Sequence, residues 1–179
     1  MSTPRIAPGG RRELGLVNHA ISVVAGRAVG GRRPHVFTTL GRQRRLFRGW
    51  LAYSAALMPF GRLPRTDTEL VILHVATLRA CDYELHHHRR LGRRVGLSPE
   101  QVEHAGDATW SGWDARRRAL LDAAAGLVRD GDLDDATWAR LREHLDEPGA
   151  IELVMLVGQY DALATTLNTL RVQHDGPAG

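Results

Sequence analysis

Residues 81–88 read Cys-Asp-Tyr-Glu-Leu-His-His-His, and this stretch carries most of the information in the chain. Successive residues of an α-helix are about 100° apart, so Cys81, Glu84 and His88 share one face. The same face continues through apolar residues at positions 85, 91 and 95. A carboxyl and an imidazole on an inward-facing stripe cost free energy unless they are paired. We therefore expect Glu84 and His88 to form either a structural polar pair or a functional site.

The neighbouring histidines do not indicate a metal site. His86 and His87 project away from His88 on a helix, where arginines cover much of the remaining surface. Three adjacent histidines on one helix cannot converge on a single ion, and no third ligand stands at a suitable spacing from Glu84 and His88. We expect no metal ion and no other cofactor.

Glu69 precedes Cys81 by twelve residues, at the start of another predicted helix. Thr66 and Glu69 have the spacing of a capping box, in which each side chain accepts a hydrogen bond from a backbone N–H of the first turn. Two interpretations of Glu69 follow. It either caps this helix or contributes to a site with the residues of the 81–88 stretch.

The order Glu69, Cys81, Glu84, His88 resembles the motif of the carboxymuconolactone decarboxylase and alkylhydroperoxidase D family. In the peroxidase branch of that family, Cys-x-x-Cys is followed by a histidine four residues later. The decarboxylase-like branch has Tyr-Glu-x-x-x-His, which Tyr83, Glu84 and His88 match. The resemblance implies that Glu69, Cys81, Glu84 and His88 are catalytic residues.

The resemblance extends well beyond the motif, from about residue 34 to residue 173. It implies one all-α domain of the alkylhydroperoxidase D (AhpD-like) fold over 34–173, preceded by a tail and first helix over 1–33 and followed by a tail over 174–179. The hydrophobic periodicity agrees with about seven or eight helices. They are predicted at 12–28, 36–57, 67–80, 81–95, a short helix from 98, 114–129, 134–145 and 148–172. A strand pattern is negligible.

Cys81 is the only cysteine of the chain and stands at the first position of the family's redox pair, while Glu84 occupies the second. No disulfide can form within one chain. A peroxidase cycle would therefore need a thiol from another molecule or from a second subunit. The alternative is that Cys81 is a buried cysteine that packs as a small apolar residue.

All 24 basic residues are arginine, which excludes Schiff-base chemistry and a phosphate-loop lysine. The net charge is only +4, and we find no nucleic-acid-binding motif, so no nucleic-acid partner is expected. Hydrophobic residues make up 43% of the chain without a run of eighteen, and no membrane association is expected. The N-terminus lacks the apolar segment of a secretion signal, which predicts a cytoplasmic protein.

The favoured function is an acid/base enzyme of the carboxymuconolactone decarboxylase type, acting on a small organic acid or carbonyl compound. His88 would be the acid/base group, and Glu84 would fix its tautomer or share its proton. Glu69 and Tyr83 would support them, with Tyr83 at the substrate. Arg79 is the candidate for binding a substrate carboxylate.

Two alternatives remain open. In a one-cysteine hydroperoxide reductase, Cys81 would attack the peroxide while His88 and Glu69 assist proton transfer. The chain could instead be a non-catalytic oligomeric protein that binds a small molecule in the same place. In each case a homo-oligomer is expected, because the helices at 67–80 and 148–172 carry more apolar surface than a small domain hides.

Overall fold

A computed structural model describes residues 3–29 and 32–175, and all regular secondary structure within these ranges is helical. The order is α1 (Arg11–Val29), α2 (His35–Leu40), α3 (Arg44–Leu57), α4 (Arg65–Leu78), α5 (Asp82–Val95), α6 (Pro99–Glu103), the 3-10 helix η1 (His104–Gly106), α7 (Ala115–Asp130), α8 (Asp135–Arg142) and α9 (Glu147–Leu170). The all-α prediction is confirmed. One more α-helix is present than predicted, because the segment at 36–57 divides at Gly41 into α2 and α3.

The chain divides into two compact units, residues 1–55 with 166–179, and residues 56–165. The domain boundaries at 33 and 173 stay a prediction, and the last residues of the predicted C-terminal tail, 176–179, lie outside the described residues. The first unit contains α1, α2 and most of α3. Its α1 is kinked at Gly15, whose φ of 72° suits glycine. Buried Asn18 of α1 donates to the carbonyl oxygen of Gly41 over 2.9 Å.

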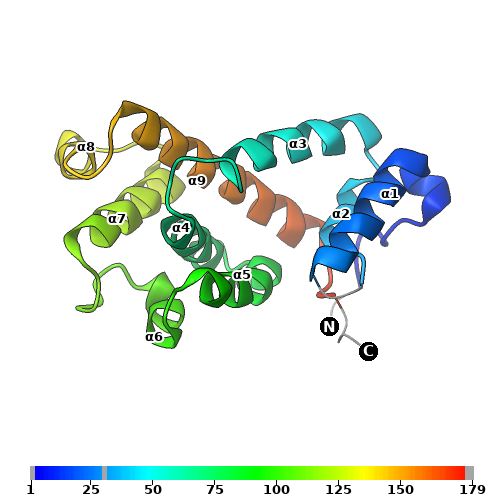
Figure 1. The fold of residues 1–179 in the computed structure, drawn as a ribbon, viewed down its shortest axis with the longest axis horizontal. Helices are drawn as coiled ribbons and strands as arrows, with labels where there is room; N and C mark the ends of the chain where they lie inside the picture. The colour runs from blue at the N-terminus through cyan, green and yellow to red at the C-terminus, as the bar shows by residue number, and fades with distance from the viewer. Residues whose placement is uncertain (1–2, 30–31, 176–179) are drawn as a thin grey trace. The chain divides into compact units, whose positions relative to one another are not determined.

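The second unit is built around α4, which lies between α5 and α7 in Figure 1 and contacts both of them. It also contacts η1. Residues 67–76 of α4 are all buried. The sequence explains this position, because apolar residues lie on nearly every side of the helix and must be covered all round. Leu70 and Leu73 of α4 belong to a core cluster with Leu97, Val102, Ala105, Trp113 and Leu121.

The ends of α5 and α6 follow the local sequence signals. Gly96 terminates α5 in the left-handed conformation at φ 112°, as predicted for a glycine cap. Ser98 and Gln101 form a reciprocal capping box at the start of α6. The predicted capping box of Thr66 and Glu69 is wrong, because α4 begins two residues earlier than expected for that box, with Pro64 at its N-cap.

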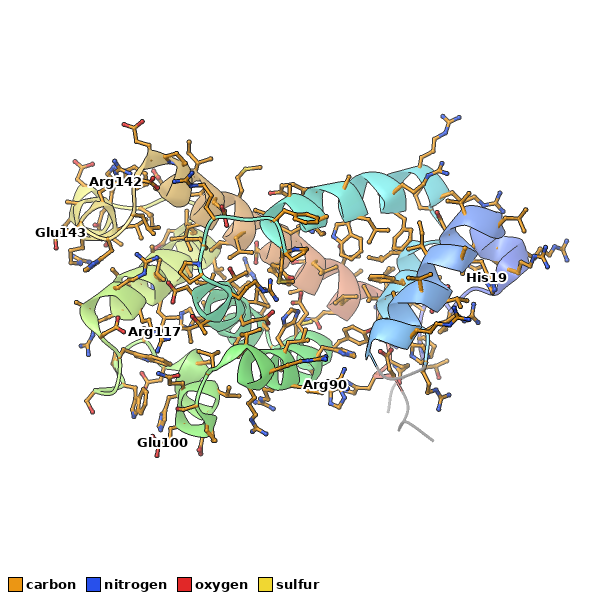
Figure 2. All side chains as sticks on the ribbon, viewed as in Figure 1. His19, Arg90, Glu100, Arg117, Arg142 and Glu143 are labelled. Carbon is orange, nitrogen blue, oxygen red and sulfur yellow. The ribbon has the colours of Figure 1, made fainter. Side chains whose placement is uncertain are left out.

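The surface of the second unit carries many of the charged side chains. Figure 2 labels Arg90 on α5 and Glu100 on α6, and both residues are exposed. In the described part of the chain, α9 alone is long and apolar enough to cross a membrane by length and composition. A core helix has the same composition, and Leu153, Leu156 and Ala164 of α9 are buried against protein. The absence of membrane association stays a prediction.

Candidate functional site

Glu69 lies at the centre of a chain of polar contacts between α4 and α5. Its side chain is 0% exposed. Oε1 accepts a hydrogen bond from Nη2 of Arg65 over 2.6 Å, and Oε2 lies 2.6 Å from Nδ1 of His88. A carboxylate oxygen paired with an arginine accepts hydrogen bonds, so Nδ1 of His88 carries the hydrogen of the second bond. Nε2 of His88 is then the nitrogen that is left for proton transfer.

The structure shows which carboxyl contacts His88. The sequence predicted that Glu84, one turn before His88, fixes the tautomer of His88 or shares its proton. The contact with Nδ1 of His88 is instead made by Glu69 from the facing helix, and a shared proton between Glu84 and His88 stays a prediction. The two helices approach closely at Gly92 of α5. A Cβ there would lie 3.0 Å from Cδ1 of Leu97 and 3.8 Å from Cβ of Glu69. A small residue at 92 therefore helps α4 and α5 to bring Glu69 and His88 together.

Glu84 is a buried carboxyl of a different kind. It is 2% exposed, and apart from the neighbouring Cys81 thiol its oxygens have no hydrogen-bond partner among the residues that the structure describes. Burial raises the pKa of Glu84 to about 8; the neighbouring Cys81 thiol lowers it in part, and the charge of Asp161 raises it. Desolvation disfavours the ionised form, so Glu84 is mostly protonated at neutral pH and can act as a proton donor.

Cys81 occupies the N-cap position of α5 and is 0% exposed. Burial raises the pKa of its thiol to about 12, and the charge of Glu84 adds to this shift. The backbone N–H groups of Glu84 and Tyr83 act in the opposite direction but do not outweigh burial. Since the thiolate is the nucleophile of cysteine chemistry, Cys81 in this state has the properties of a packing residue.

Tyr160 of α9 completes the cluster. Its ring meets that of His88 edge to face, with the ring centroids 5.3 Å apart, and the side chain is largely buried. Burial raises the pKa of the Tyr160 phenol, the charges of Glu69 and Glu84 raise it further, and Arg65 opposes them. Tyr160 is therefore a neutral hydroxyl that lies near the groups of both α4 and α5.

The other two predicted site residues make contacts of a different kind. The ring of Tyr83 lies 4.6 Å from that of His87, measured between centroids. Arg79 pairs with Asp161 and donates to the carbonyl oxygen of Val128 over 2.9 Å. Their roles at a substrate stay predictions. Arg65 was not predicted at all, although its spacing of four residues before Glu69 is a recognisable helical ion-pair signal.

The arrangement of the described residues contains no group of three or more histidine, cysteine, aspartate or glutamate side chains that could hold a metal ion. It offers instead a protonated carboxyl at Glu84, an oriented imidazole at His88 and a neutral phenol at Tyr160. Such a set can donate and accept protons at a bound organic molecule.

Comparison with known proteins identifies similar sequences and folds. Residues 44–126 match the model of the Carboxymuconolactone decarboxylase family. No match was found among curated proteins.

Three solved structures illustrate the fold. The AhpD core of an uncharacterized peroxidase-related protein from Ralstonia eutropha JMP134 is 20% identical, with a TM-score of 0.88 over 98% of this chain and 94% of that chain. An uncharacterized peroxidase-related protein from Silicibacter sp. TM1040 is 17% identical, with a TM-score of 0.85 over 98% and 96% of the two chains. The debrominase Bmp8, as a cysteine-to-alanine variant in complex with 2,3,4-tribromopyrrole, is 17% identical, with a TM-score of 0.82 over 98% and 94%.

Proposed function

We propose, from the match of residues 44–126 to the Carboxymuconolactone decarboxylase family model and from the similar fold of the solved structures, that this chain is an acid/base enzyme acting on a small organic acid or carbonyl compound. The observation that carries the proposal is an oriented imidazole in the same cluster as a protonated carboxyl. Glu69 orients His88 through Nδ1, while burial keeps Glu84 protonated. An imidazole nitrogen can accept a proton and a carboxylic acid can donate one, so the two groups are suited to opposite roles in proton transfer.

The reaction follows from these two states. In a decarboxylation, the carbon–carbon bond to the carboxylate breaks, carbon dioxide leaves and the bonding electron pair is delocalised as an enolate. Protonated Glu84 gives its proton to the resulting carbanion and is later reprotonated from water. If the first step is removal of a proton from carbon, Nε2 of His88 accepts it, and Glu69 stabilises the imidazolium that forms.

Turnover of a substrate panel by matched variants tests this proposal. The panel contains small keto acids, unsaturated carboxylic acids and lactones, followed by carbon dioxide release and ultraviolet absorbance. We expect His88→Gln and Glu84→Gln to lose at least about 100-fold in kcat while keeping the fold, because an amide hydrogen-bonds but does not shuttle a proton. His86→Gln is the control, since His86 is an exposed histidine of the same helix. Full activity in His88→Gln would contradict the proposal.

A thiol-dependent reaction is the second candidate, because Cys81 adjoins Glu84 in the cluster and relatives of this fold are described as peroxidase-related. In it, the sulfur of Cys81 attacks a peroxide oxygen, giving a sulfenic acid and an alcohol, and an external thiol then reduces the sulfenic acid. The same panel separates the acid/base reaction from the thiol reaction when hydrogen peroxide and dithiothreitol are included. For the acid/base reaction, turnover should survive in Cys81→Ser. Peroxide consumption that is lost in Cys81→Ser but kept in Glu84→Gln would favour the thiol reaction.

A further inference from the structure

Two groups of the cluster are buried without the partners that their chemistry requires. Nη1 of Arg65 and both oxygens of Glu84 are closed off from solvent; Nη1 has no hydrogen-bond partner in the described part of the protein, and Glu84 has beside it only the thiol of Cys81. Buried polar groups are nearly always paired with protein, water or a ligand. A cationic donor without an acceptor, and a carboxyl with only a weak thiol donor beside it, therefore indicate that this cluster can bind a polar ligand.

The contact with Glu69 fixes the direction of the Arg65 guanidinium. Nη2 donates a hydrogen bond to Glu69 over 2.6 Å. Because the guanidinium group is planar, this bond also fixes the position of Nη1. Although the side chain as a whole is 35% exposed, Nη1 itself is buried. Arg65 can therefore hold Glu69 and offer a second N–H group to a ligand at the same time.

Tyr160 lies near the same groups as Nη1 of Arg65. Its ring packs against His88, and its phenol is influenced by the charges of Glu69, Glu84 and Arg65. Besides the cationic N–H of Arg65, the protonated carboxyl of Glu84 and the phenol of Tyr160 each have an O–H to donate. A cluster of hydrogen-bond donors that includes a cation is suited to bind a negatively charged oxygen.

We propose that Nη1 of Arg65 binds an anionic oxygen of the substrate, a carboxylate or enolate oxygen, and that Tyr160 and Glu84 donate to the same ligand. The residue predicted from sequence for this role, Arg79, is already engaged by Asp161 and Val128. The assignment to Arg65 rests on the proposed function for the identity of the ligand as a substrate. Anion binding itself is measured without turnover.

Nuclear magnetic resonance titration with acetate and benzoate tests the site, with acetamide and benzamide as uncharged probes and sodium chloride at equal ionic strength as the blank. The readouts are the ring signals of His88 and Tyr160. We expect saturable shifts with the two anions and none with the amides. Arg65→Gln should weaken anion binding at least about tenfold, because it removes a charge-assisted hydrogen bond. Arg65→Lys keeps the positive charge but has a single terminal nitrogen in place of Nη1 and Nη2. It should weaken anion binding by less than Arg65→Gln.

Arg89→Gln is the matched control, because it removes one exposed arginine from α5 and lowers the net charge equally. Unchanged melting temperatures would show that Glu69 and the fold survive in the Arg65 variants. Equal anion binding by Arg65→Gln and wild type, or no saturable shift with either anion, would overturn the assignment. Anion binding that depends on Arg65 in a protein without turnover would leave the assignment standing and would contradict only the proposed reaction.

Discussion

At the scale of single residues, Glu69 and Glu84 show how environment separates two carboxyls of the same cluster. Both are almost completely buried. Glu69 accepts hydrogen bonds from Arg65 and His88, whereas the oxygens of Glu84 have only the Cys81 thiol beside them within the described ranges. A buried acid with few donors keeps its proton, since burial disfavours the charged form. Glu84 is therefore a protonated carboxyl at neutral pH, whereas Glu69 holds Nδ1 of His88.

This difference predicts how Glu84 affects stability as the pH changes. Burial raises the pKa of Glu84 from 4.5 to about 8 on folding. Between these values the folded state binds more protons than the unfolded state, so the contribution of Glu84 is fully present below the lower value and is lost as the pH rises through the higher one. We expect the free energy of unfolding of wild type to fall, relative to Glu84→Gln, by up to roughly 1.4 kcal/mol per pH unit in this window.

Urea denaturation at pH 5, 6, 7, 8 and 9 measures the effect as the difference between the two proteins. Glu100→Gln makes the same chemical change at an exposed position of α6 and should show no such pH trend. A constant difference between wild type and Glu84→Gln over this range would show that Glu84 is ionised in the folded state.

At the scale of helices, local sequence signals predicted where the helices lie better than they predicted which residues of different helices make contact. The caps at Gly96 and Ser98 depend on a few adjacent residues, and the sequence alone identified both. The partner of His88 depends on which residue of α4 faces α5, which spacing along one helix does not reveal. The clustering of Tyr160 with His88, from a helix more than seventy residues away in sequence, is likewise a product of packing. The sequence therefore named four residues that lie together, Glu69, Cys81, Glu84 and His88, but not the contacts between them, and their catalytic roles stay predictions.

The capping box of α6 gives a prediction at this scale. The hydroxyl oxygen of Ser98 accepts a hydrogen bond from the backbone N–H of Gln101 over 3.1 Å, and the side chain of Gln101 accepts one from the backbone N–H of Ser98 over 3.0 Å. Ser98→Ala removes the first bond and should lower the free energy of unfolding by about 1 kcal/mol. Urea denaturation measures this, with Ser111→Ala at an exposed position as the control. A change no larger than in the control would contradict it.

At the scale of the whole molecule, α9 presents apolar side chains to solvent on the side opposite its buried residues. Ile151 is 64% exposed and Met155 is 46% exposed, one helical turn apart, with Val154 beside them at 37%. Neighbouring apolar residues on a surface are typical of subunit interfaces. The expected homo-oligomer therefore stays a proposal, with this part of α9 as its contact surface.

Light scattering at micromolar concentration checks the assembly. We expect a mass that is a multiple of 19.8 kDa for wild type, and a smaller assembly for Ile151→Glu, because a charge in an apolar interface is costly. Thr165→Glu places the same charge at another exposed position of α9 and should leave the mass unchanged. A monomer mass for wild type would rule out the proposed oligomer at that concentration.

The contact between Glu69 and His88 joins two consecutive helices, only 19 residues apart in the chain. Glu69, Glu84 and His88 are therefore held together by one pair of consecutive helices, α4 and α5, while Tyr160 reaches them from α9. Substitutions in α9 can change the residues that cover this cluster without changing the contact between Glu69 and His88. For the proposed enzyme, this separation would let substrate preference change through α9 while the proposed proton-transfer groups keep their positions.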